Sequence, residues 1–299
     1  MYLNMLSDCL KNQYGCKVYK LSLSSGCGCP NRDREGKNGC IFCDGAGAFA
    51  AAGPIPEQLA EARQRVARKL RGEAKYIAYF QSFTNTFAPA SHLEPLFRQA
   101  MEPEDVVALS IATRPDCLGE DILDLLDSLN RIKPVWVELG LQTIDPQTAA
   151  FIRRGYPLSV YDRAVTALKQ RGITVIVHQI LGLPGEDEET MIDTARYIGA
   201  SGADGIKFHL LHVLRGTELG EIWQQGGYQP MALPDYIRIL ERCVEVIPRE
   251  MVIHRLTGDG AKRDLLAPLW SGDKKRVLNE INRAFRLDDI RQGSRCGIV

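Results

Sequence analysis

The chain has 299 residues, 45% of them hydrophobic, which is enough to bury the core of one α/β barrel or of two smaller domains. Its 37 basic residues balance its 37 acidic ones, so bulk electrostatic attraction alone would not hold it to nucleic acid, although a local basic face could. The sequence has no apolar run of membrane-spanning length and no signal-peptide pattern at its start, which predicts a cytoplasmic protein without membrane contact.

Short apolar runs rich in β-formers alternate along the chain with segments of helical period. We predict strands, in chain order, at Val18–Leu23, Tyr76–Gln81, Val106–Ala112, Val135–Leu141, Thr174–Ile180, Gly205–Leu211 and Val252–His254. We predict helices at Pro56–Arg71, Ser91–Met101, Gly119–Arg131, Ser159–Arg171, Asp187–Ser201, Leu233–Val246 and Lys274–Phe285. Pro56 suits a helix start, and Gly72 suits the end of that helix.

This alternation predicts an α/β fold, a partial (β/α)6-type TIM-like barrel of parallel strands. An open doubly wound sheet is disfavoured because no Gly-x-Gly-x-x-Gly loop follows the first strand. We expect residues 1–17 to form an N-terminal arm, residues 18–257 the barrel, and residues 258–299 a helical C-terminal extension. Polar residues follow most predicted strands, and in a barrel all these strand ends open on one face, where active sites are built.

Three cysteines, Cys29, Cys40 and Cys43, lie close together after the first predicted strand. The chain has nine cysteines, and in a reducing compartment they are expected to bind metal or to be buried rather than to form disulfides. A structural zinc site usually has four protein ligands. Cys27 could supply the fourth, but only one residue separates it from Cys29, which is an unusually short spacing for two zinc ligands. An iron–sulfur cluster with one open iron needs three thiolates, so the spacing favours iron–sulfur and leaves zinc as the alternative.

The cysteine cluster resembles that of the radical S-adenosylmethionine (SAM) superfamily, and the ten-residue first gap is similar to the branch of the Elongator catalytic subunit. The segments Cys-Pro-Asn-Arg-Asp, Tyr-Phe-Gln-Ser-Phe-Thr-Asn-Thr, Leu-His-Val-Leu-Arg-Gly-Thr and His-Arg-Leu-Thr-Gly-Asp-Gly look like the YhcC-like bacterial subfamily. The resemblance implies a [4Fe–4S] cluster held by the three cysteines, with SAM on the fourth iron. It also implies reductive cleavage of SAM to a 5′-deoxyadenosyl radical and an electron donor such as flavodoxin or ferredoxin.

The resemblance further implies SAM contacts near the first two strands. Phe42, between the second and third cysteines, stands where family members carry an aromatic residue packed by adenine. Gln81, Ser82 and Asn85 lie where the family has a glycine-rich segment that holds the SAM amino group. The glycines are absent here, so we expect these three side chains to contribute contacts instead. Plain packing of the loop is the alternative for Phe42.

Later strands carry further residues that match SAM contacts. Gln142 matches the fourth-strand Gln that meets the ribose or methionyl part, and Arg154 matches the Arg that pairs with the SAM carboxylate. The fifth-strand segment beside adenine corresponds to residues 178–186, which include Gly182. His178 begins this segment and is a candidate ribose contact, with hydrogen-bonded structure as the alternative.

His212, His254 and Arg255 are the candidate catalytic residues on the substrate side, and His209 and Asp259 lie near them in sequence. Arg255 could hold an anionic group such as a phosphate. The alternative for each is structural, since a barrel mouth needs polar groups to satisfy its loops.

The Elongator resemblance implies chemistry on the wobble uridine of transfer RNA. Two local basic stretches agree with it: residues 274–299 carry seven Lys or Arg against three acidic residues, and five basic residues crowd the predicted helix between Arg63 and Arg71. Solvated helix faces explain both stretches equally. A small-molecule or peptide substrate, or a non-catalytic iron–sulfur or zinc redox-sensing protein, stays an alternative.

Overall fold

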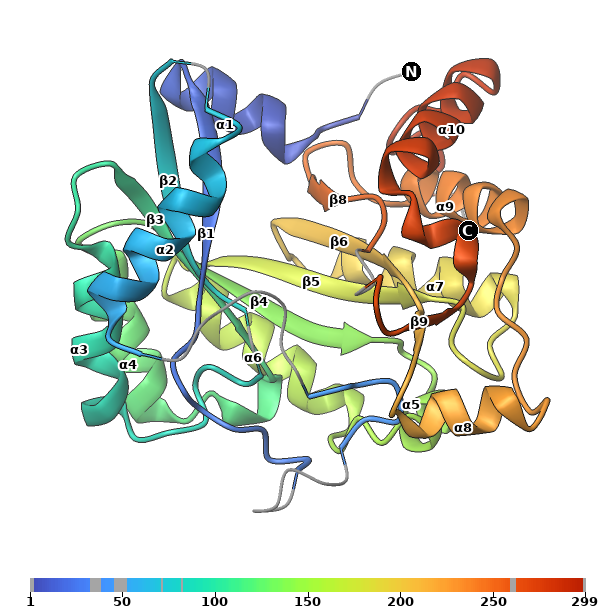
Figure 1. Ribbon diagram of the computed structural model, residues 1–299, viewed down its shortest axis with the longest axis horizontal. Helices are drawn as coiled ribbons and strands as arrows, with labels where there is room; N and C mark the ends of the chain where they lie inside the picture. Colours follow the sequence, from blue (N-terminus) through green and yellow to red (C-terminus); the bar gives the residue numbers. More distant parts are fainter. Residues whose placement is uncertain are drawn as a thin grey trace.

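The computed structural model describes residues 3–32, 39–45, 53–70, 72–81, 83–258 and 262–297. Seven parallel strands in the order β1-β2-β3-β4-β5-β6-β8 form one curled sheet, a half-barrel with helices (Figure 1). This confirms the predicted α/β partial TIM-like barrel. The strands are β1 (Lys17–Leu23), β2 (Ala74–Phe80), β3 (Val106–Thr113), β4 (Val135–Gln142), β5 (Thr174–Leu181), β6 (Gly205–Leu210) and β8 (Val252–Arg255).

The crossover helices pack on the convex, outer face of the sheet, as expected for right-handed βαβ units. Each predicted helix is present, with its ends shifted by a few residues. The helices are α2 (Ile55–Ala67), α3 (Ala90–Met101), α4 (Glu120–Asn130), α6 (Leu158–Gln170), α7 (Glu188–Ala200), α9 (Leu233–Val246) and α10 (Lys274–Leu287).

Several short elements were not predicted. They are α1 (Leu6–Tyr14), α5 (Pro146–Phe151), α8 (Glu218–Gln224) and an antiparallel pair of short strands, β7 (Val213–Leu214) and β9 (Leu265–Ala267). Strand β9 lies within the segment that we expected to be a helical extension. That segment is therefore helical only in part, and β9 ties it back to β7, just past the end of β6.

The two faces of the sheet differ because side chains alternate along each strand. On β6, Ile206, Phe208 and Leu210 are buried in the core between the sheet and its helices. Lys207 and His209 point to the opposite face, which is the interior of the half-barrel. Strand β4 shows the same division, with Val137 and Leu139 in the outer core. The outer face is thus apolar, and polar side chains gather inside.

Helix α1 closes the floor of the half-barrel at the amino ends of the strands. Its buried Leu10 packs with Ile77 and Ala108, which face inward from β2 and β3. The preceding residue Met5 forms a parallel bridge with Ile253 on β8. Because α1 contacts both β1 and β8, it fills the space between the two edges of the open sheet at this end. The interior is therefore accessible from the opposite end, at the carboxyl ends of the strands.

Candidate active site

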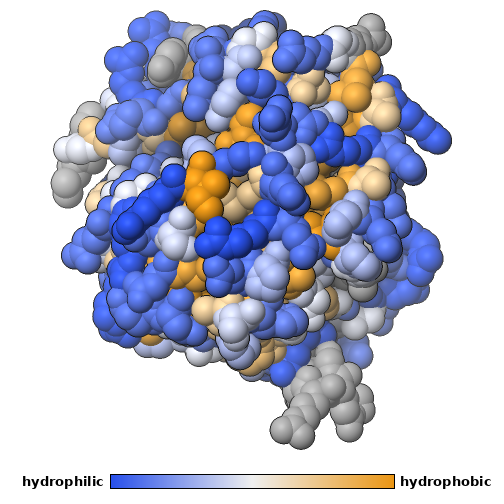
Figure 2. Space-filling model, turned by 90° about the vertical axis from the view of Figure 1, so that its left-hand side faces the viewer, coloured by the Kyte–Doolittle hydropathy of each residue, from blue (hydrophilic) through white to orange (hydrophobic). Residues whose placement is uncertain are grey.

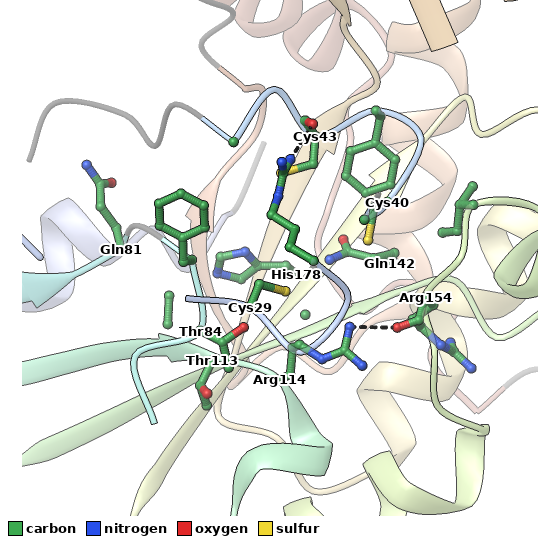
Figure 3. A pocket seen from close by; sticks show the side chains of 18 of the residues that line it. Cys29, Cys40, Cys43, Gln81, Thr84, Thr113, Arg114, Gln142, Arg154 and His178 are labelled. Atoms are coloured by element: carbon green, nitrogen blue, oxygen red, sulfur yellow. Dashed lines mark hydrogen bonds between the residues drawn. The ribbon is translucent and has the colours of Figure 1, made fainter. Parts of the chain in front are cut away.

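Cys29, Cys40 and Cys43 line one pocket at the carboxyl ends of the strands, with a volume of about 300 Å³ (Figure 3). The Cys29 carbonyl accepts a hydrogen bond from the Arg32 amide at 2.9 Å, and the Cys40 carbonyl accepts one from the Cys43 amide at 3.0 Å. Two tight turns thus hold the ends of the cysteine loop, whose residues 33–38 lie outside the described residues. Burial raises the pKa of the Cys40 thiol, so only a metal or another cation would favour its thiolate there.

Asn31 ties the cysteine loop to the turn after helix α5. Its side-chain Nδ2 donates to the Arg153 carbonyl at 2.6 Å and to the Arg154 carbonyl at 3.2 Å, and it lies 3.5 Å from the Cys40 sulfur. Gly155 makes this approach achievable. A Cβ on Gly155 would lie 2.4 Å from Asn31 Oδ1, and its φ of +86° is one that other residues rarely adopt.

Arg114 reaches from the end of β3 beneath the cysteines. Its guanidinium pairs with Asp116 at 2.7 Å, donates to the Arg154 carbonyl at 2.8 Å, and lies over the ring of Tyr156, 5.2 Å from its centroid. The Tyr156 hydroxyl donates to the Gly140 carbonyl, and burial raises its pKa. Arg114 is therefore held on several sides, and it is one of the cations close to the cysteines (Figure 3).

Gln142 ends β4 in a strained conformation. Its φ is +71°, in the left-handed region, and the β4–β5 ladder has a bulge between Gly140 and Gln142. The Gln142 side chain folds back so that a Cβ on Gly140 would lie 2.8 Å from its Nε2. A glycine two residues earlier thus makes room for Gln142, which lines the pocket. The contact with SAM that its family match implied stays a prediction.

Arg154 also lines the pocket, but its side chain extends away from Cys29 (Figure 3). Its Nη1 donates to the carbonyls of Leu141 at 3.2 Å and Thr143 at 2.5 Å, and its Nε donates to the Tyr156 carbonyl at 3.1 Å. Much of the Arg154 hydrogen-bonding capacity therefore organises the β4 loop. Contact with a carboxylate of SAM stays a prediction, and Arg114 is a second cation beside it.

His178 lines the floor of the pocket from β5, together with Glu138 from β4. Its Nε2 lies 2.8 Å from Glu138 Oε2, and burial lowers its pKa to about 4, so the ring is neutral at physiological pH. The sequence left ribose binding and hydrogen-bonded structure open for His178. The His178 ring contacts Glu138 and also lines the cysteine pocket, so both alternatives stay open.

Of the remaining residues predicted to contact SAM, some line the cysteine pocket and others do not. Phe42 and Gln81 line the pocket. Asn85 is fully buried behind it and donates to the Ala112 carbonyl at 2.9 Å, so it orders the strand ends. The Gly182 carbonyl accepts from the Tyr228 hydroxyl at 2.6 Å, and Gly182 is not among the residues that line the pocket. Ser82 lies outside the described residues.

The structure does not bring the predicted substrate-side residues to this pocket. His254 packs its ring against Trp136, 5.7 Å between centroids, and faces a separate cavity beside α1 at the floor. His212 and Arg255 do not line the cysteine pocket either, and Asp259 lies outside the described residues. A role for these residues in catalysis stays a prediction, with the floor position of His254 the least favourable.

Sequence reasoning missed Asn31, Glu138 and Tyr156. Glu138 left a visible signal, because a single acidic residue in the inward register of an apolar strand must find partners inside the fold. Asn31 belongs to the Cys-Pro-Asn segment and Tyr156 follows Arg-Arg-Gly, but their partners come from loops distant in sequence. Only the folded chain places these residues together.

The donor set suits an iron–sulfur cluster with an open iron. Three thiols line the pocket, and Cys27, the alternative fourth zinc ligand, is instead buried in the hydrophobic core. The pocket continues past the cysteines to Gln142 and His178, which leaves space beside a cluster for a second polar molecule. These residues fit a [4Fe–4S] cluster and SAM.

Comparison with known proteins gives matches along nearly the whole chain. The family model of the Radical SAM superfamily matches residues 23–198, and that of the Radical_SAM C-terminal domain matches residues 203–286. The chain is similar to YtqA of Bacillus subtilis, with 41% identity over 95% of this chain and 89% of that protein. It is similar to YhcC of Escherichia coli, with 36% identity over 98% and 95%. A tRNA uridine(34) acetyltransferase of Methanocaldococcus jannaschii is 32% identical over 58% of this chain and 32% of its own length.

Among solved structures, the archaeal Elp3 of Methanocaldococcus infernus matches with a TM-score of 0.70 at 18% identity, over 93% of this chain and 64% of that chain. This likeness shows a shared fold. Within the part of the chain that the structure describes, the helices are too short or too polar to cross a lipid bilayer. The family match and the three thiols that line one pocket lead to one conclusion: the chain belongs to the radical SAM superfamily and is a radical SAM enzyme, whose cofactors are a [4Fe–4S] cluster and S-adenosylmethionine.

Proposed function

We propose that this radical SAM enzyme modifies transfer RNA at the wobble uridine. The observation that carries the proposal is the similarity to the tRNA uridine(34) acetyltransferase, which extends over 179 residues, or 58% of this chain. The match reaches 32% of that relative's length, so its acetyl transfer is not carried over to this chain.

An exposed aromatic side chain in the lining of the cysteine pocket supports a nucleobase as substrate. Phe83 lines the cysteine pocket and is 39% exposed, and Phe87, a few residues on, is 49% exposed. Phe151 is 49% exposed beside the pocket residue Ile152. Proteins that act on a base commonly extrude it and stack it on aromatic rings. Phe83 therefore offers an exposed ring on which an extruded base could stack in the pocket.

The two basic stretches of the sequence lie away from this mouth. Arg63 on α2 is held by Asp105, which directly precedes β3 at the amino end of the sheet, with 2.7 Å between Arg63 Nη2 and Asp105 Oδ1. Gln292, in the C-terminal stretch, donates to the carbonyls of Pro248 and Met251 before β8, both at 2.7 Å. Figure 2 shows the side of the molecule that carries α2 as mostly hydrophilic, with small separate hydrophobic patches.

Phosphate contacts should therefore come from the rim beside β7 and β9. Arg215 and Lys262 are exposed there, and the amide of Arg215 donates to the Asp264 carbonyl, which joins the two segments. The side chain of Arg263 is 94% exposed. Lysine and arginine side chains on such a rim bind the phosphates of an RNA and hold it in place. They do not read its base sequence.

When bound, the cluster and SAM supply a 5′-deoxyadenosyl radical that removes a hydrogen atom from the substrate. The chain's own residues bind and orient these groups. Cys29, Cys40 and Cys43 would hold the cluster, and Gln142 and Arg114 line the space beside it. An electron donor such as flavodoxin or ferredoxin would dock at the cysteine loop.

Mass spectrometry of tRNA nucleosides from a deletion strain tests the proposal. Loss of one modified uridine, restored by the wild-type gene and by Cys296→Ala but not by Cys40→Ala, is the expected result. Cys296 is an exposed cysteine outside the pocket, so it controls for the loss of a thiol alone. An unchanged nucleoside profile in the deletion strain would reject tRNA and favour a small-molecule or peptide substrate.

A further inference from the structure

A cluster of polar side chains fills the middle of the half-barrel, between the cysteine pocket and the floor formed by α1. We call this cluster the polar chamber. Its centre is Glu138, whose side chain is fully buried. The chamber comprises Lys20, Tyr79, Ser110, Glu138, His178, Lys207 and His209, which come from β1 to β6.

Both carboxylate oxygens of Glu138 are occupied. Oε1 accepts from Lys20 Nζ at 2.7 Å and from Ser110 Oγ at 2.7 Å. Oε2 accepts from Tyr79 Oη at 2.9 Å and also from Lys207 Nζ, and His178 Nε2 lies 2.8 Å away. The two ammonium groups lower the pKa of Glu138 well below its usual value despite burial, so it is ionised. Burying charges costs free energy that apolar packing would not, which makes a purely structural cluster an expensive solution.

Positive charge exceeds negative charge in the chamber. Two lysines face the single carboxylate of Glu138, and the neutral rings of His178 and His209 add no negative charge. The guanidinium of Arg255, opposite Lys207 in the β6–β8 ladder, adds a further positive potential at Lys207 and His209. Among the described residues of the chamber, Glu138 is the sole acidic group. An anion entering the chamber would therefore be attracted.

Hydrogen-bond donors remain in the chamber after Glu138 is satisfied. An ammonium has three N–H donors. Lys207 directs donors to Glu138 and Tyr79, and Lys20 directs one to Glu138 and lies over the Tyr79 ring. Within the described part of the chain, His209 Nε2 is buried and has no hydrogen-bond partner. The His209 ring stacks beside His178, 5.0 Å between centroids, and His178 and Glu138 also line the cysteine pocket. The chamber thus borders the cofactor site through these two residues.

We propose that the polar chamber binds an anionic group of the substrate, a carboxylate or a phosphate, with Lys207, Lys20 and His209 as its ligands. An anion held there would place the neighbouring carbon atoms of the substrate next to the cysteine pocket, where hydrogen abstraction takes place. The inference rests on the radical SAM site and deepens the proposed function, because it identifies a chemical group that the substrate must carry.

The test measures anion binding without turnover. The holoenzyme, with its cluster reconstituted and its SAM site filled by S-adenosylhomocysteine, is titrated with acetate and with inorganic phosphate, and each affinity is read by nuclear magnetic resonance of the ligand. The two anions compare a carboxylate with a phosphate. We expect saturable binding of at least one of them and a loss of affinity of tenfold or more in Lys207→Met. Lys133→Met is the matched control, because Lys133 is half-buried but bonds to the Met101 and Pro103 carbonyls at the amino end of the sheet.

Glu138→Gln should have the opposite effect, since it removes the competing carboxylate and tightens anion binding severalfold. If Lys207→Met alone does not fold, the double variant Glu138→Gln with Lys207→Met removes both charges of the pair and leaves the net charge of the chamber unchanged, with Lys20 still positive. Equal affinities in wild type, Lys207→Met and Glu138→Gln, or no saturable binding of either anion, would overturn the inference. Because tRNA is absent from this measurement, a negative tRNA result would reject the proposed function while leaving anion binding established.

Discussion

The outer face of the parallel sheet packs against helices through apolar side chains, whereas its inner face carries a floor of packed side chains, a charged middle and the cysteine pocket. Neighbouring residues of one strand belong to these different environments: Phe208 is fully buried under the outer helices, and His209 lies in the polar chamber. The outer face holds the sheet in its curled shape. The inner face can therefore carry strained and charged residues that reduce stability, and stability and chemistry are separable by position in the strand.

The largest expected effect comes from the cysteine pocket. Cys40→Ala removes one of three thiolates and should abolish the cluster, so that iron content, the [4Fe–4S] absorbance and SAM cleavage to 5′-deoxyadenosine are all lost. Cys296→Ala, outside the pocket, should retain all three. Cleavage of SAM by Cys40→Ala would show that the ligands are assigned wrongly.

Substitutions at the adjacent residues Phe208 and His209 test whether the two faces of the sheet differ in function. Phe208→Ala should reduce the free energy of unfolding by about 3–5 kcal/mol, the usual cost of truncating a fully buried aromatic residue, as measured by urea denaturation. His209→Ala should cost much less stability and instead weaken acetate or phosphate binding. If both variants lost the same stability and neither changed anion affinity, the division of labour between the faces would fail.

A smaller effect is expected at the turn that supports the cysteine loop. Gly155→Ala places a Cβ 2.4 Å from Asn31 Oδ1 and forces a left-handed φ on alanine, which should cost about 1–3 kcal/mol and lower the yield of reconstituted cluster. Gly172→Ala is the control, since Gly172 has a φ of +65° but nothing within 4 Å of its Cβ position. Equal iron content in both variants would show that the Asn31 contact does not support the cluster.

The smallest expected effect is a pH dependence of anion binding. Burial lowers the pKa of Lys207 to about 7, against the opposing charge of Glu138. The groups that face it are Lys20, Tyr79, Glu138, His178, His209 and Arg255, of which the histidines are already neutral at this pH. The protonated amine attracts the anion, so affinity should be highest below pH 7 and fall as the pH rises through 7. Lys207→Met should flatten this profile, and a profile unchanged by the substitution would point to another titrating group.

Local patterns were sufficient to predict the strands, the crossover helices and the convergence of the three cysteines on one pocket. Alternation in the apolar run Val135–Leu141 predicted a strand, because apolar side chains recur on one face. The same alternation could not show that Glu138 collects partners from other strands, since those contacts join residues far apart in the sequence. Arg154 illustrates the limit for a single residue: it lines the pocket, and its pairing with the SAM carboxylate stays a prediction, while its hydrogen bonds go largely to backbone carbonyls that only the loop geometry reveals.

Helix α1 links the two ends of the chain. Met5 bridges to Ile253, and the Asn4 amide donates to Gln292 Oε1 at 2.8 Å, 288 residues away. During synthesis these contacts can form only after the segment that contains Ile253 and Gln292 has left the ribosome. Contacts between segments so far apart in sequence form slowly, so we expect the base of the half-barrel to be completed late in folding.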